Sequence, residues 1–95
     1  MIEFEWDPRK AKSNVMKHGV AFAEAATVFG DPLEVTIPDP NHSIGEYRYL
    51  SMGVSERGRL LVVLYVEEEP HLIRIISARR ATRHEKKQYE SHTGK

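Results

Sequence analysis

The sequence predicts an α+β domain: a central antiparallel sheet of about four to five strands, with N-terminal helices on one side and a helix at the C-terminal end. Helix signals occupy the first thirty residues, and alternating or wholly apolar runs separated by turns fill residues 33–80. A capping-box pattern after the last run adds the final helix. Ninety-five residues suffice for one modest core, so residues 1–95 are expected to form a single domain.

The N-terminal third is predicted to hold one short strand and two helices. The run IEFEW, residues 2–6, alternates as a strand does. Asp7, followed by proline, begins a helix over residues 8–17, which ends at Gly19 because glycine readily takes a left-handed C-cap conformation. A second helix, about residues 22–29, places one set of apolar side chains on one face: Phe22, Ala25, Ala26 and Phe29.

Four runs in the middle of the chain are predicted strands: LEVTI (33–37), EYRYLSMGV (46–54), RLLVVLYVE (59–67) and LIRIISAR (72–79). The third is apolar on both faces, as a central strand is. Because short turns separate these runs, neighbouring strands are expected to pair antiparallel.

The C-terminal segment is predicted to be a weakly packed helix. Thr82 and Glu85 fit the T-x-x-E capping box, so the helix begins near Arg83. Its only large apolar side chain up to residue 92 is Tyr89. We therefore expect the helix to be held loosely by the sheet, or by a partner.

Composition indicates a soluble globular protein, with 40% hydrophobic and 29% charged residues. No apolar run approaches the roughly 20 residues of a membrane helix, and the acidic start MIEFEWDPRK does not resemble a secretory signal. We expect a cytoplasmic protein that does not contact a membrane. The absence of cysteine excludes disulfides and thiolate chemistry.

A net charge of zero hides a strong asymmetry along the chain. Residues 18–73 carry three Lys and Arg against nine Asp and Glu, whereas residues 74–95 carry seven against two. The C-terminal end is therefore basic, and an anionic partner such as nucleic acid is one interpretation. A solvated basic helix with no ligand is the other.

Strand parity gives the arginines a predicted direction, because side chains alternate between the two faces of a sheet. Glu46 and Arg48 continue the apolar row Leu50, Met52 and Val54. In the last run, Arg79 is predicted to continue the row Ile73, Ile75 and Ser77. Such charges either pair with one another, for example Glu46 with an arginine, or line the mouth of a site.

Several chemistries lack support in the sequence. No metal-ligand spacing, phosphate-binding glycine loop or nucleophile elbow is present, so we predict neither a metal nor a cofactor. No pattern predicts a helix-turn-helix, so the chain is not expected to read DNA by itself.

The two ends of the chain resemble one known family. The segments FEWDPRKAKSNVMKHGVAFAEAATVFGDP and GRLLVVLYVE…IRIISARRATRHEKKQYE are similar to BrnT, the toxin component of type II toxin–antitoxin pairs, and the resemblance covers residues 4–90. Its signatures are W-D-P-x-K with N-x-x-K-H-G at residues 6–19 and I-S-A-R-x-A-T-x-x-E at 76–85. The loop pattern D-x-x-H-S with E-x-R at residues 39–48 also matches.

Two positions depart from that pattern. Ala21 stands where such sequences usually have serine, so the second helix lacks a side-chain N-cap, a loss of about 1 kcal/mol. After the central strand, where T-E-R is frequent, this chain has Val66, Glu67 and Glu68, so a basic residue is missing there.

The resemblance implies a compact RelE-like fold and a ribonuclease that inhibits translation and growth by cutting RNA. It also implies neutralisation by a cognate antitoxin of the ribbon-helix-helix type, similar to BrnA. Toxin and antitoxin together would bind their promoter DNA, with the antitoxin making the DNA contact.

Metal-independent RNA cleavage requires a base, an acid and cations at the phosphate. Arg79 and Arg48 are predicted as those cations, because both leave the sheet at rigid strand positions and arginine holds two phosphate oxygens at once. Glu46 is predicted as the base, or as the partner that orients Arg48. His18, beside Lys17 at a helix C-terminus, is predicted as the acid, or as part of a simple helix stop.

Contacts to the flanking RNA are predicted for four further residues: Arg80, Arg83, Lys12 and Tyr89. An alternative role for Tyr89 is to anchor the C-terminal helix.

Three functions remain open from the sequence. The favoured one is a metal-independent endoribonuclease toxin. The second is a non-enzymatic nucleic-acid-binding module whose basic end is only an electrostatic footprint. The third is an inactive partner that only binds an antitoxin. Removal of Arg79 discriminates the first two, because it would abolish cleavage in an enzyme and only weaken binding in a binder.

Overall fold

The computed structural model describes residues 1–38 and 47–93, which form a five-stranded sheet with three α-helices and one 3-10 helix. In chain order the elements are β1 (Glu3–Glu5), α1 (Pro8–His18), α2 (Phe22–Ala26), η1 (Thr27–Gly30), β2 (Val35–Pro38), β3 (Arg48–Val54), β4 (Leu60–Glu69), β5 (Leu72–Arg80) and α3 (Arg83–His92). The predicted α+β class is confirmed.

The local signals fold as expected at both ends of the chain. The Asp7 side chain accepts a hydrogen bond from the Arg9 amide, and Gly19 closes α1 in the left-handed conformation. Thr82 and Glu85 form a complete capping box at the start of α3. The second helix is shorter than predicted: α2 has no side-chain cap at its N-terminus and tightens into η1 after five residues.

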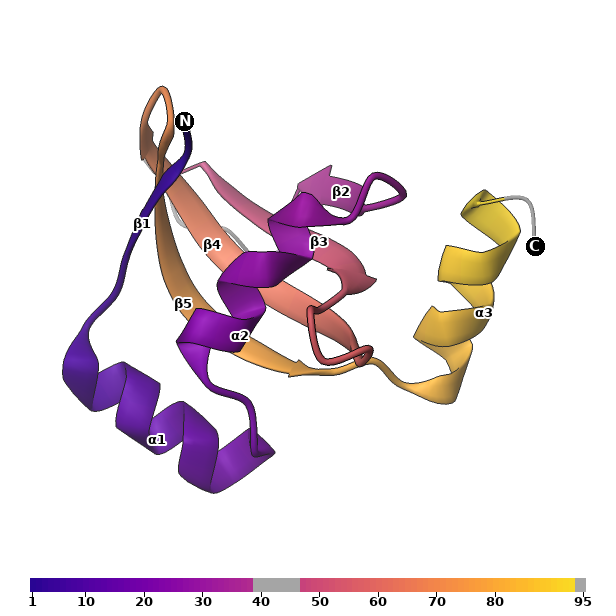
Figure 1. Cartoon of the computed structure of the whole chain (residues 1–95), viewed down its shortest axis with the longest axis horizontal. Coiled ribbons are helices and arrows are strands. Elements are labelled where there is room, and N and C mark those ends of the chain that lie inside the picture. Colours follow the sequence, from indigo (N-terminus) through magenta and orange to yellow (C-terminus); the bar gives the residue numbers. More distant parts are fainter. Residues whose placement is uncertain (39–46, 94–95) are drawn as a thin grey trace.

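The strand order is β1-β5-β4-β3-β2 (Figure 1). As predicted, β2 to β5 pair antiparallel through consecutive connections. The sheet as a whole is mixed, however, because β1 pairs parallel with β5, with Glu3 opposite Leu72. Helices rather than a short turn connect β1 to the next strand. The expectation that neighbouring strands pair antiparallel applies only to strands joined by short turns, so it does not cover β1.

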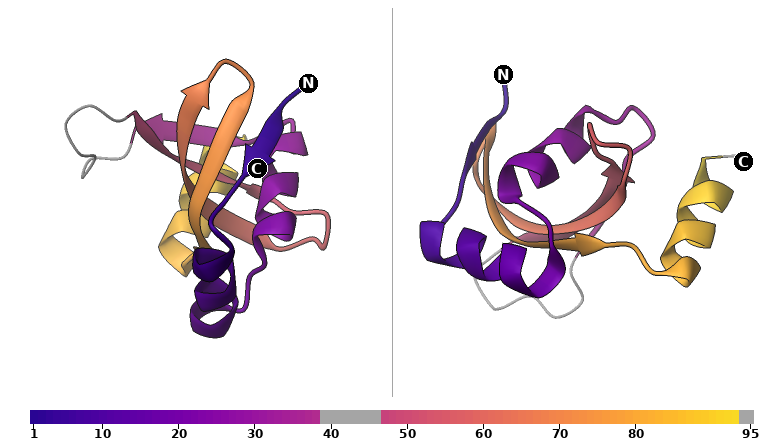
Figure 2. Two further views of the ribbon diagram at one scale, coloured as in Figure 1. Left: turned by 90° about the vertical axis from the view of Figure 1, so that its left-hand side faces the viewer. Right: turned by 60° about the horizontal axis from the view of Figure 1, so that its bottom comes forward.

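The helices occupy three different places around a curved sheet. Figure 2 shows α2 inside the concave side of the sheet. Helix α1 packs against β5, and α3 lies on the opposite side of the molecule from α1. None of the described helices is long and apolar enough to cross a membrane.

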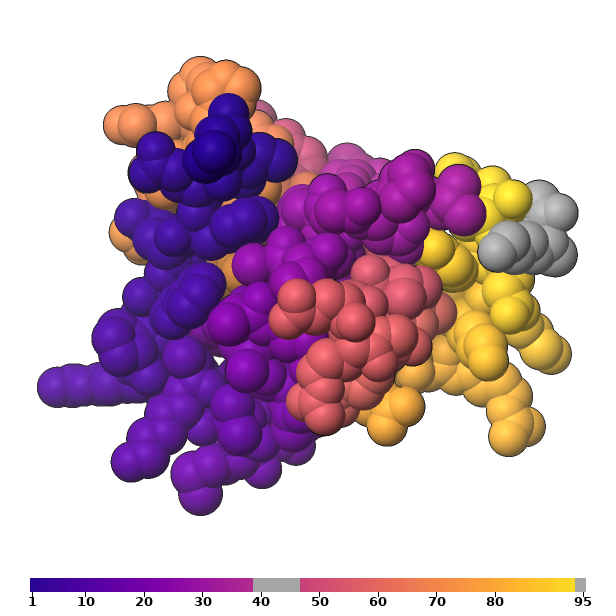
Figure 3. All heavy atoms as spheres, in the orientation of Figure 1, coloured from indigo at the N-terminus to yellow at the C-terminus, as the bar shows by residue number. Residues whose placement is uncertain are grey.

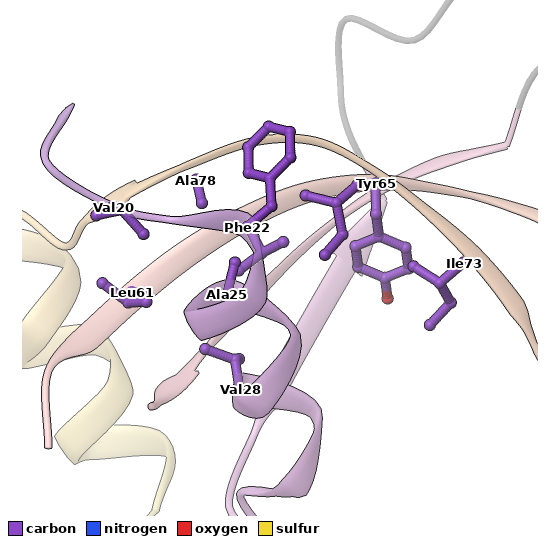
Figure 4. Packing of buried hydrophobic residues seen from close by; sticks show 10 residues of the cluster. Val20, Phe22, Ala25, Val28, Leu61, Tyr65, Ile73 and Ala78 are labelled. Atoms are coloured by element: carbon purple, nitrogen blue, oxygen red, sulfur yellow. The ribbon is translucent and has the colours of Figure 1, made fainter. Parts of the chain in front are cut away.

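One hydrophobic core lies between α2 and the sheet (Figure 4). Phe22 and Val28 enter it from the helical side, and burying each such side chain stabilises the fold by about 1.5–3 kcal/mol. The closeness of this packing appears at Gly53, where an added Cβ would lie 2.9 Å from a Val28 methyl group. The sheet contributes Leu61, Val63, Tyr65, Ile73, Ile75 and Ala78.

The prediction that Arg79 shares a face with Ile73 and Ile75 is wrong, because β5 contains a bulge, whereas Ser77 does lie on the face of Arg79. Leu64 pairs with Ser77 and the next residue, Tyr65, pairs with Ile75, so Ile76 has no partner in the β4 register. One extra residue reverses the alternation. As a result Arg79, which pairs with Val62, points to the face opposite the one that Ile75 faces.

A buried asparagine joins α1 to the edge of β5 that β1 leaves uncovered. The Asn14 amide nitrogen donates to the carbonyls of Val20 and Ala78, each at 2.8 Å, and its oxygen accepts from the Ala78 amide at 3.1 Å. The Asn14 side chain therefore provides hydrogen-bond partners for the backbone N–H and C=O of Ala78. Without it, these two groups at the edge of β5 would be buried without partners.

Asn14→Ala should destabilise the protein by about 3 kcal/mol, because it leaves buried backbone groups of Ala78 and Val20 without partners. Urea unfolding would measure the change. Ser13→Ala, on the neighbouring exposed position, is the control and should alter stability by less than about 0.5 kcal/mol. Equal stability of the two variants would contradict this role for Asn14.

Candidate nucleic-acid interface

The side chains that point away from α2 form a second face of the sheet, which we call the open face. Cross-strand pairing joins Arg79, Val62, Met52 and Val35 in one row of this face. A parallel row holds Ser77, Leu64, Leu50 and Ile37. The open face is therefore largely apolar, with arginine at its β5 side.

Arg79 is held by a carboxylate of α3. Its two terminal nitrogens donate to the two Glu85 oxygens at 2.7 and 2.9 Å, a bidentate ion pair. The Arg79 side chain remains 40% exposed and that of Glu85 23% exposed. The pair lowers the pKa of Glu85 to about 2, chiefly through the hydrogen bonds from Arg79, so this carboxylate is ionised at neutral pH.

Tyr89 provides the other tertiary attachment of α3. It is the one buried residue among those described in this helix, and its hydroxyl donates to an Asp31 oxygen at 2.7 Å. The same Asp31 oxygen accepts from the Val54 amide at 2.8 Å. Burial, and then the Asp31 carboxylate, raise the pKa of Tyr89 to about 12. This arrangement agrees with the alternative prediction for Tyr89, that it anchors the C-terminal helix.

An apolar groove of about 230 Å³ lies between α3 and the open face. The sheet supplies aliphatic side chains and α3 supplies polar ones: Val35, Ile37, Leu50, Met52 and Val62 face Glu85, Gln88 and His92. Ile37 is 49% exposed although it is a large apolar residue.

A second groove, of about 350 Å³ and basic in character, lies on the other side of α3. It runs between the helix and the β3–β4 turn, which packs between α2 and α3 in Figure 3. Arg59, Arg80 and Lys86 supply its cations, and Glu90 is the acidic residue in its lining. Among the described residues, no ion pair involves Arg80 or Lys86.

A buried carboxylate positions one wall of this basic groove. Glu24 of α2 is 5% exposed and accepts hydrogen bonds from Nε and Nη2 of Arg59 and, at 2.7 Å, from the Ser55 hydroxyl. The hydrogen bond from Arg59 is the main reason that the pKa of Glu24 is lowered. Arg59 also donates to the Gly19 carbonyl at 3.2 Å, which ties the turn to the end of α1.

The two arginines predicted to bind the reacting phosphate, Arg48 and Arg79, lie on the same face of the sheet but are not adjacent. Arg48 pairs with Val66 and Arg79 with Val62, on opposite sides of β4. Four residues of strand separate the two positions by roughly 13 Å. Glu46, the predicted base, lies outside the described residues.

The remaining predicted residues are spread over both ends of the molecule. Lys12, Lys17 and His18 are exposed on α1, and none of the described contacts joins them to Arg79. Arg83 is exposed in the first turn of α3. Arg80 lies in the basic groove.

Three residues of this interface could not be predicted from the sequence. Glu85 was identified as a helix cap but not as the partner of Arg79, because the turn between β5 and α3 determines that contact. Arg59 and Lys86 carry no local signal either, since the basic groove joins a hairpin turn to a helix distant in sequence. In the described part of the chain, no three His, Cys, Asp or Glu side chains group as metal ligands.

Comparisons with known proteins agree on one family. The model of the family described as "Ribonuclease toxin, BrnT, of type II toxin-antitoxin system" matches residues 6–85. The 1.1 Å crystal structure of the Brucella abortus ribonuclease toxin BrnT superposes with a TM-score of 0.68 at 20% identity, covering 87% of this chain and 100% of that one. Curated protein sequences give no significant match. The fold and the family match together establish that this chain belongs to the BrnT family of ribonuclease toxins of type II toxin–antitoxin systems.

Proposed function

We propose that this chain is an endoribonuclease that cuts RNA without a metal ion, by transesterification at a phosphate bound to Arg79. A base removes the proton of a 2′-hydroxyl, the oxygen attacks the adjacent phosphorus, and the 5′-oxygen leaves with a proton from an acid. The products are a 2′,3′-cyclic phosphate and a 5′-hydroxyl. Family membership supports the ribonuclease class.

The bidentate geometry of Arg79 is the observation that carries the proposal. The guanidinium already holds two oxygens of one carboxylate in parallel, and a phosphodiester offers an equivalent pair of oxygens. Arg79 also leaves the sheet from a paired strand, so its backbone is rigid. Cations fixed in this way stabilise the charge that gathers on the phosphate in the transition state.

The proton-transfer residues rest on the sequence alone. Glu46 stays the proposed base, with Arg48 beside it along the chain as a second cation. His18 and Lys17 stay proposed as the acid and its neighbour, although they lie on α1. His18→Ala tests this role: unchanged cleavage over the whole pH range would remove His18 from the mechanism.

Arg79→Ala should lower RNA cleavage by at least about 100-fold and abolish growth arrest, because one stabilising donor at the reacting phosphate is lost. Inducible expression followed by growth curves and total RNA integrity measures both effects, and RNA binding by the purified variant should fall only modestly.

Arg74→Ala is the matched control for that experiment. Arg74 also lies on β5, at its other end, where it forms ion pairs at 3.0 Å with Glu5 and Glu68. If both variants cleave RNA at the same rate, the chain has no catalytic arginine at position 79. If the wild type cuts no RNA, binding of RNA by the purified protein decides between the two other functions: a nucleic-acid-binding module binds RNA, whereas a partner that only binds an antitoxin does not.

We further propose that the basic groove binds phosphates of RNA that flank the cut bond. Arg80 and Lys86 both line it and have no ion-pair partners among the described residues, so RNA can bind there without breaking a salt bridge of either residue. Arg83 and Lys12 are exposed and are proposed as outlying contacts. Tyr89 supports the groove through α3, since its hydroxyl is bonded to Asp31.

The double variant Arg80→Ala with Lys86→Ala should weaken binding of single-stranded RNA. Two lost phosphate contacts reduce the slope of log K against log salt concentration by about 1.4. Fluorescence anisotropy at several salt concentrations measures this slope. The control removes two cations from the start of α1, Arg9→Ala with Lys10→Ala, and equal slopes in the two double variants would exclude the groove as the binding site.

An antitoxin is implied by membership of a toxin–antitoxin family. We propose that it is a ribbon-helix-helix protein that covers α3 and the apolar groove, and that the pair binds promoter DNA through the antitoxin. The exposed aliphatic side chains of the open face, such as Ile37, support a protein partner there.

Binding of the antitoxin should slow amide hydrogen exchange over residues 82–90 and at Arg79, because the covered backbone opens less often. Exchange measured by mass spectrometry on the free and bound toxin tests this. Exchange in α1 provides the internal reference, and a change confined to α1 would place the antitoxin elsewhere.

A further inference from the structure

We propose that Glu85 is an internal anion that occupies the phosphate-binding fork of Arg79, so that RNA reaches Arg79 only after this carboxylate is displaced. The inference rests on the proposed role of Arg79 in RNA binding and adds its regulation: α3 carries a built-in competitor of the substrate.

The contact geometry supports direct competition. Both terminal nitrogens of Arg79 donate to Glu85 oxygens, at 2.7 and 2.9 Å, and one of them also donates to the Arg80 carbonyl at 3.3 Å. A phosphodiester that binds the same end of the Arg79 guanidinium needs these two nitrogens. Glu85 and a phosphate therefore cannot both hold Arg79 in this bidentate manner.

The helix that carries Glu85 is attached in a way that permits displacement. Besides the ion pair, its tertiary attachment in the described structure is the buried Tyr89 and the hydrogen bond from Tyr89 to Asp31. The other side chains of α3 are exposed or only partly buried. In Figure 1 the helix stands at the end of the sheet, joined to β5 by a short extended segment.

The charge balance predicts how the competition appears in a measurement. When RNA replaces Glu85, the phosphate releases its condensed cation, but the Arg79–Glu85 ion pair has to break, and salt favours that step by screening the pair. These two effects of salt oppose each other, so the Arg79 contact makes the wild-type affinity less dependent on salt than a contact with no ion pair to break. Without the Glu85 charge, the same contact would release about 0.7 of a cation per phosphate bound to a single strand.

Glu85→Gln tests the proposal, because glutamine can still form the capping box and differs only by the charge. Its affinity for a 2′-O-methyl oligoribonucleotide, which transesterification cannot cleave, should rise roughly three- to tenfold at low salt. Its slope of log K against log salt concentration should steepen, by up to about 0.7. Fluorescence anisotropy measures both.

Two controls separate displacement from a general loss of negative charge. Glu69→Gln removes a charge from the exposed end of β4, outside both grooves and at a residue without an ion pair among those described, and should change affinity by less than twofold, as roughly expected for a solvent-screened charge. In an Arg79→Ala background, Glu85→Gln should no longer tighten binding. A similar gain in Glu85→Gln and Glu69→Gln, or a gain that persists without Arg79, overturns the proposal.

A second measurement stands even if Glu85→Gln does not fold. In the Arg80→Ala, Lys86→Ala variant, whose α3 lacks the proposed groove contacts, saturation with the uncleavable RNA should speed amide exchange in α3, because the helix loses one of its two attachments. Unchanged or slower exchange there would show that Glu85 stays on Arg79, and would overturn the proposal.

These outcomes are independent of catalysis. If the toxin cuts RNA but Glu85→Gln binds no more tightly than wild type, the ribonuclease function stands and the competition is wrong. If the toxin cuts no RNA but the binding results hold, Arg79 is an RNA-binding residue regulated by α3 in a protein without the proposed activity.

Discussion

Strand β5 pairs with β4 over most of its length, but the pairing skips Ile76, and this bulge determines where the cations of the strand point. A regular strand would have turned Arg79 to the core side with Ile73 and Ile75. The bulge instead sends Arg79 to the open face. There it meets Glu85 of α3, while the next residue, Arg80, lines the basic groove. Two adjacent arginines thus serve two different surfaces.

Helix α3 separates two surfaces of opposite chemistry. On one side it closes the apolar groove with the aliphatic side chains of the open face, and on the other it closes the basic groove with the β3–β4 turn. The two polar attachments of the helix also differ, since the ion pair of Arg79 is partly exposed whereas Tyr89 is buried. A helix with little buried area and one charged attachment is well suited to respond to either a protein or an RNA ligand.

The basic groove depends on a buried carboxylate that is distant from α3. Glu24 holds Arg59, and through Ser55 it also holds the turn that forms one wall. Burying a charge is costly unless it is paired and hydrogen-bonded, and here both conditions are met. The cation Arg59 is therefore positioned by the core of the protein, whereas Arg80 and Lys86 extend from the surface.

Local signals in the sequence determined the elements and their ends: Asp7 and Gly19 at α1, Thr82 at α3, and the alternation of the strands. These signals act over a few residues, so the sequence alone specifies them. The parallel pairing of β1, the bulge at Ile76 and the contact between Arg79 and Glu85 depend on how distant segments meet. Only the tertiary structure decided them, because packing across strands, rather than local preference, selects the register and hence the face on which each charge lies.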